Sequence, residues 1–108
     1  MSSLFAWGLV LAAGVLEVGM AFALKASDGG TKALPSVLAL VTALGSIWLL
    51  ASAVRALPLG VAYAVWTGIG AVGVTLVGLL VFAESLSVPR LLFMALVFVG
   101  IVGLKVAR

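Results

Sequence analysis

The sequence contains no cysteine and no histidine, and charge is sparse, with six basic and three acidic residues among 108. The missing cysteines exclude disulfides and thiol chemistry, and the two absences together remove the usual ligands of haem iron and zinc. We therefore expect no metal, no cofactor and no enzyme activity. The basic residues stand singly at the ends of apolar segments, which suits lipid headgroups and not the phosphate backbone of nucleic acid.

Apolar surface, by contrast, is in excess, since 66% of the residues are hydrophobic. A soluble domain of this length hides only about 60–70% of its unfolded surface. We therefore expect an integral membrane protein, with apolar stretches at residues 4–24, 34–54, 58–82 and 91–106. Each is close to the roughly 20 residues that cross a hydrocarbon core. Because lipid offers no partner to free backbone groups, and the alternating segments of a β-barrel are missing, we predict an all-α membrane protein.

The predicted architecture is a single transmembrane domain of four helices, covering residues 1–108. No basic segment precedes the first stretch, so a cleaved signal peptide is not expected. The side of the two termini carries Arg55, Lys105 and Arg108, and the opposite side carries Lys25, Lys32 and Arg90. Because each side carries three basic residues, the positive-inside rule predicts no preferred orientation. Such a tie arises from small size alone or from a chain that inserts in both orientations.

Glu17 is the acidic residue that lies inside a predicted span. A charged group at that depth costs about 2.5–3.5 kcal/mol on insertion scales. One interpretation is a protonated carboxyl that bonds a neighbouring helix. The other is a site that binds a proton or a cation in turn, which is favoured because the same span offers no basic partner. Gly14 lies one turn away on the same face and leaves room beside the carboxylate.

The third apolar stretch carries two aromatic residues and a cluster of glycines. Tyr63 and Trp66 share one helix face by their spacing. They are either residues of the interfacial aromatic belt or the walls of a cation site, because aromatic faces attract cations. Gly68, Gly70 and Gly73 permit a helix bend or a close approach of another helix.

These features together resemble the small multidrug resistance family over nearly the whole chain. The longest matching segment is Leu57-Pro58-Leu59-Gly60-Val61-Ala62-Tyr63-Ala64-Val65-Trp66-Thr67-Gly68-Ile69-Gly70. Shorter matches are Ala13-Gly14-Val15-Leu16-Glu17-Val18, Ala23-Leu24-Lys25-Ala26-Ser27 and Gly103-Leu104-Lys105. The Trp-Thr-Gly-Ile-Gly run and the Gly-Leu-Lys tail resemble the guanidinium-exporter subtype.

The resemblance implies a proton-coupled exporter of small organic cations, such as guanidinium, in the inner membrane of a bacterial cell. It also implies an antiparallel, dual-topology dimer of two oppositely inserted copies surrounded by lipid. The acid that matches Glu17 would bind the proton or the cation, and the residues that match Tyr63 and Trp66 would shape the site. The serine that matches Ser46 would join the polar network around the acid, and Lys105 is typical of the subtype.

Met20 departs from the pattern, because the guanidinium subtype usually has tryptophan three residues after the acid. Methionine has no N–H to donate, and its flexible side chain suits varied ligands. Met20 would then line a broader site that accepts quaternary ammonium ions and other drugs, or a partner chain in a heterodimer would supply the missing contact. An alternative of another class is a non-transporting assembly subunit in which Glu17 bonds helices together.

Overall fold

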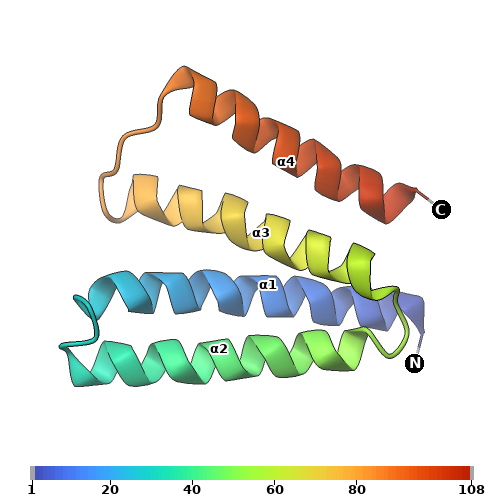
Figure 1. Cartoon of the computed structure of the whole chain (residues 1–108), viewed down its shortest axis with the longest axis horizontal. Coiled ribbons are helices and arrows are strands. Elements are labelled where there is room, and N and C mark those ends of the chain that lie inside the picture. The colour runs from blue at the N-terminus through green and yellow to red at the C-terminus, as the bar shows by residue number, and fades with distance from the viewer. Residues whose placement is uncertain (1, 108) are drawn as a thin grey trace.

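The computed structural model describes residues 2–107, which form four helices (Figure 1). The helices are α1 (Ser3–Ala26), α2 (Ala33–Ala53), α3 (Leu59–Leu80) and α4 (Val88–Val106). All four are long and apolar enough to cross a membrane. The prediction of an all-helical chain with four membrane-length helices is confirmed.

Local capping signals set where two of the helices begin. Ser2 caps α1 by accepting the backbone N–H three residues later at 3.1 Å, and Ser87 caps α4 by accepting the N–H of Arg90 at 3.4 Å. Such serines satisfy donors that a helix leaves free in its first turn. Pro89 has no N–H to satisfy at that position. Consequently α4 begins at Val88, ahead of the apolar stretch predicted from residue 91.

The four helices do not contact one another equally. α1 packs against both α2 and α3, whereas within the described residues the backbone of α4 lies close only to that of α3. Figure 1 shows α4 at the outer edge of the bundle, with both ends of the chain on the same side. No residue of α4 is buried. One face of α4 therefore remains open to lipid or to a second chain.

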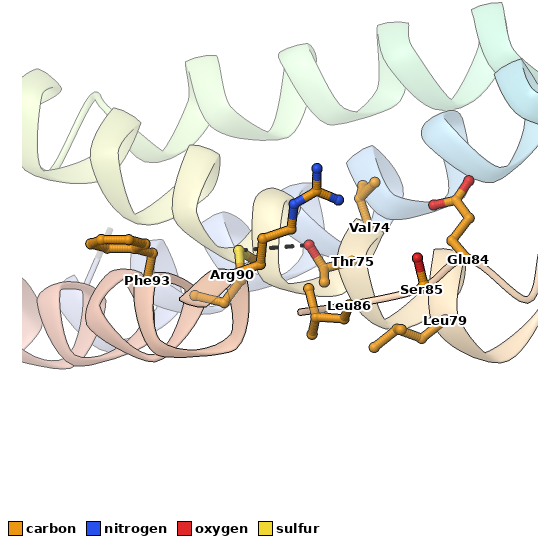
Figure 2. A pocket seen from close by; sticks show the side chains of 9 residues that line it. Val74, Thr75, Leu79, Glu84, Ser85, Leu86, Arg90 and Phe93 are labelled. Atoms are coloured by element: carbon orange, nitrogen blue, oxygen red, sulfur yellow. Dashed lines mark hydrogen bonds between the residues drawn. The ribbon is translucent and has the colours of Figure 1, made fainter. Parts of the chain in front are cut away.

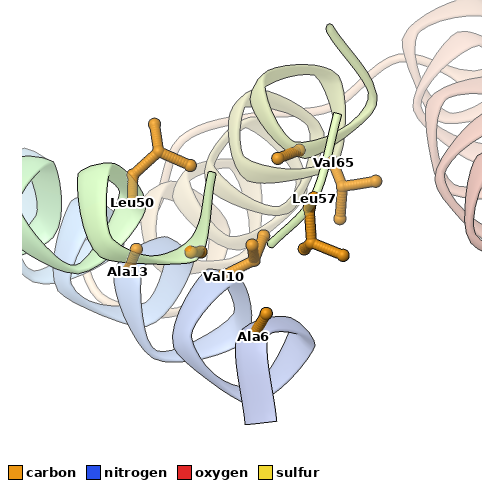
Figure 3. Close-up of a cluster of buried hydrophobic side chains, with 8 residues drawn as sticks. Ala6, Val10, Ala13, Leu50, Leu57 and Val65 are labelled. Atoms are coloured by element: carbon orange, nitrogen blue, oxygen red, sulfur yellow. The ribbon is translucent and has the colours of Figure 1, made fainter. Parts of the chain in front are cut away.

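The buried core lies in the half of the bundle nearest the two chain ends (Figure 3). Its members are mostly small and come from α1, α2, α3 and the α2–α3 connection: Ala6, Val10, Ala13, Leu50, Ala53, Leu57, Ala62 and Val65. Small side chains let helices approach closely, which is how packing is gained in lipid. α1 and α3 are thus held together at this end. Glu17 lies one turn beyond the last core residue of α1.

Candidate functional site

The Glu17 carboxylate lies in the seam between α1 and α3. Its Oε2 atom is buried and has no hydrogen-bond partner among residues 2–107. Gly70 of α3 makes room for it, because a Cβ atom placed on Gly70 would lie 2.5 Å from Oε2 and 2.6 Å from the carboxyl carbon. Buried polar atoms are rarely left without a partner, and leaving one so is costly. A group that donates a hydrogen bond or carries a positive charge would satisfy this oxygen.

A second polar group joins three helices next to the acid. The hydroxyl of the buried Ser46 donates to the Ala13 carbonyl at 2.6 Å, and the Trp66 indole N–H donates to the same hydroxyl at 2.8 Å. In an α-helix the Ala13 carbonyl also accepts the backbone N–H of Glu17. Ser46 is therefore linked to Glu17 through the backbone of α1, and it makes no hydrogen bond to the carboxylate within residues 2–107.

The two aromatic residues of α3 lie side by side. The ring centroids of Tyr63 and Trp66 are 5.2 Å apart with an edge-on angle of 68°. Tyr63 is 53% exposed, and its hydroxyl makes no hydrogen bond to Glu17 within the described part of the chain. The indole is thus fixed by Ser46, while the phenol stands at the outer edge of the site.

Three glycines of α1 and α3 act as packing positions. A Cβ atom on Gly14 would lie 2.6 Å from Ile69 Cγ2, so the room predicted beside the acid is largely filled by that side chain. Gly68 receives Ile101 of α4 in the same way, and Gly73 receives a side chain of α1. α3 is one continuous helix from residue 59 to residue 80. Gly14, Gly68 and Gly73 therefore serve close packing against apolar side chains. Gly70 differs from these three because it faces the Glu17 carboxylate.

Met20 is half-buried on α1, on nearly the same face as Glu17 because of the spacing of three residues. The structure thus gathers Glu17, Gly70, Trp66 and Ser46, and Met20 lies about one turn farther along α1 on nearly the same face as Glu17. The contributions of the Ala13 carbonyl and Ile69 had no sequence signal, because one is a backbone atom and the other an ordinary apolar residue. No set of three metal-ligating side chains occurs among residues 2–107.

Fold and site together define a multi-pass membrane protein with a carboxylate held inside its helical bundle. Comparison with known proteins gives the family: residues 5–97 match the family described as Small Multidrug Resistance protein. This chain belongs to the small multidrug resistance family. The match confirms the resemblance, and with four membrane-length helices it places the chain in the bacterial inner membrane.

Similar proteins include several that are named guanidinium exporters. The chain is 48% identical over 102 residues to the one from Yersinia pseudotuberculosis serotype I (strain IP32953), covering 94% of this chain and 98% of the relative. It is 48% identical over 101 residues to that of Citrobacter freundii, covering 94% and 96%. The Proteus vulgaris protein is 44% identical over 101 residues, with coverage of 94% and 97%. The similarity thus extends over nearly the full length of each protein.

Proposed function

We propose that this chain is a proton-coupled exporter of small organic cations such as guanidinium, guanidinyl compounds or substituted ammonium ions. The observation that supports this most directly is the buried, unpartnered Oε2 of Glu17, seated against Gly70. The names of the similar exporters point to the same cargo. In this proposal Glu17 binds the proton or the cation, Trp66 and Tyr63 flank the cation, and Ser46 fixes the indole.

Competition for Glu17 supplies the coupling. A single carboxylate neutralises one positive charge, and in a site of low dielectric a second charge is strongly disfavoured. A guanidinium ion can bind both carboxylate oxygens in parallel, and the aromatic rings attract its charge. Glu17 therefore binds either the proton or the cation, and binding of one lowers the affinity for the other. This competition is what lets a proton gradient in one direction drive the cation in the opposite direction.

We infer that the working unit is an antiparallel dimer in which each copy contributes one four-helix domain of residues 1–108. The exposed surface of α4 and the three-against-three division of basic residues support this. Each copy would contribute its own Glu17 to a shared cavity. Identical chains are the simpler arrangement, and a heterodimer is the alternative, since a different partner could compensate for Met20.

Transport into proteoliposomes tests the proposal. Purified protein should take up guanidinium when the vesicle lumen is more acidic than the outside, because protons leave as the cation enters. Glu17→Gln should reduce this uptake to the level of empty vesicles. Cation affinity should fall by up to about tenfold for each unit by which the pH is lowered, in the range where a proton occupies Glu17. Uptake that is unchanged in Glu17→Gln would reject the mechanism, and cations that never alter Trp66 fluorescence would favour the assembly subunit.

Orientation can be tested separately, because the chain has no native cysteine. A single cysteine at Asp28, and in another variant at Arg55, should each be labelled by an impermeant maleimide in about half of the molecules. Labelling of one variant only would show a single orientation and would reject the antiparallel arrangement.

Met20 favours a second candidate, a broader multidrug exporter. A thioether side chain cannot donate a hydrogen bond to a planar cation, but it adapts to bulky apolar groups. A transport panel of guanidinium, alkylated guanidinium and tetraalkylammonium ions separates the candidates, since only the broader exporter should move the last class.

A further inference from the structure

The seam that holds Glu17 continues to a second group of charged and aromatic side chains. Lys25 lies eight residues after Glu17 on α1, about 12 Å along the helix axis, with the small Ala21 between them on the same face. On the α3 side, Gly78 lies against the carboxylate of Glu84. The seam therefore runs from the buried acid to the end of the bundle farthest from the core.

At this end of the seam, the ammonium group of Lys25 lies close to both a carboxylate and an aromatic ring. The ammonium nitrogen of Lys25 lies 3.2 Å from Glu84 Oε2 and 5.8 Å from the centroid of the Phe82 ring. The Phe22 ring packs beside Phe82, with centroids 5.4 Å apart. These four side chains help to line a cavity of about 160 Å³. A carboxylate and an aromatic face thus converge on one ammonium group.

The backbone holds Glu84 in place independently of Lys25. The backbone N–H of Glu84 donates to the Gly78 carbonyl at 2.9 Å, and the preceding Ala83 has a φ of 54°, which turns the chain back after α3. Figure 2 shows the Glu84 side chain leaving the α3–α4 connection toward α1. Arg90 lines the adjacent cavity but makes no ion pair with Glu84 within residues 2–107. The backbone at Glu84 would therefore stay in place if Lys25 were displaced, and the carboxylate would remain within reach of this end of the seam.

We propose that Glu84, Phe82 and Phe22 form a second binding site for a small organic cation, which the chain's own Lys25 occupies in this structure. The inference rests on the proposed export function. A carboxylate beside an aromatic face recognises guanidinium and alkylammonium ions, and Lys25 carries such a group. The Lys25 and Glu84 side chains are 59% and 53% exposed, so their ion pair is weak and a cation from solution can replace the ammonium.

The position of this second site gives it a role in the release of the cation from Glu17 into water. A cation that leaves Glu17 toward this end of the seam meets Glu84 next. Lys25 is tethered beside the same carboxylate and competes with the cation for it. The cation is therefore held only briefly before it passes into water, and Lys25 acts as the displacing group.

Binding of methylguanidinium to the purified full-length chain, followed by saturation-transfer NMR on its methyl protons, tests the proposal. Glu17→Gln is included throughout to remove the central site. Adding Lys25→Gln should strengthen binding about fivefold, because the competing ammonium is gone. Adding Glu84→Gln as well should abolish the gain. Lys25→Arg should give no gain because it retains a tethered cation, and Lys32→Gln is the matched control for lost surface charge.

Equal affinity with and without Lys25→Gln would overturn the proposal, as would a gain that survives Glu84→Gln. Phe82→Leu should weaken the gain and Phe82→Tyr should keep it, which tests the aromatic face while the charges stay unchanged. The central mechanism is judged separately, by the effect of Glu17→Gln in the otherwise unaltered chain. Failure at Glu84 would leave that comparison untouched.

Discussion

Replacing Ser46 by alanine should destabilise the bundle and loosen Trp66 at the same time. Ser46 is 1% exposed, and its hydroxyl donates to the Ala13 carbonyl at 2.6 Å and accepts the Trp66 indole N–H at 2.8 Å. Alanine removes both hydrogen bonds and leaves the indole N–H without its partner. Three helices lose their shared polar contact in one step.

The expected cost follows from the two bonds. Hydrogen bonds between membrane helices contribute about 0.6 kcal/mol on average and at most about 1.7. A donor left unsatisfied in a buried position costs about 1–3 kcal/mol. Because Trp66 is only half-buried, we expect Ser46→Ala to lower the free energy of unfolding by about 1–2 kcal/mol, a factor of about 5–30 in the folded population. Cation affinity should fall too, since the indole is no longer fixed.

The free energy of unfolding can be measured in mixed micelles by titrating denaturing detergent and following helix content by circular dichroism. Ser52→Ala is the matched control on the same helix, because the Ser52 hydroxyl bonds only the Trp48 carbonyl within α2. That change should cost at most about 0.5 kcal/mol. Equal stability losses in the two variants, or a stable Ser46→Ala protein with unaltered cation affinity, would refute the assignment of Ser46 as the fixing group for Trp66.

Three further substitutions test other parts of the site. Gly70→Ala should displace the Glu17 carboxylate and reduce cation affinity at least tenfold, whereas Gly60→Ala, where a Cβ meets nothing within 4 Å, should leave titration curves unchanged. Met20→Trp should raise the preference for guanidinium over tetraalkylammonium ions in transport competition, and an unchanged ratio would remove this residue from selectivity. Lys105→Gln should cost less than about 1 kcal/mol in unfolding experiments, because the Lys105 ammonium makes one cation–π contact, 5.4 Å from the centroid of the Trp7 ring.

The sequence predicts the helices and the central acid, because both signals are local. An apolar run of about 20 residues and a lone carboxylate within it are recognisable without any tertiary contact. The partners of Ser46 were not predictable, because one of them is the Ala13 carbonyl, which any residue would provide. The pair of Lys25 and Glu84 was equally hidden. The two residues are far apart in the sequence, and they meet because the α3–α4 connection brings Glu84 toward α1.

Different contacts hold α1 and α3 together at the two ends of the seam. This difference matters for an exporter, because its site must open to one side of the membrane and then to the other. Near the chain ends the helices are held together by the buried core, which includes Val10 of α1 and Val65 of α3. At the other end the polar closure is an exposed ion pair, Lys25 with Glu84. This end also has the Phe22–Phe82 contact, but it contributes no residue to the buried cluster, so we expect separation of α1 from α3 to cost less here. In the proposed antiparallel dimer, each membrane face presents the firm end of one copy beside the easily opened end of the other, so both faces can open by the same local movement.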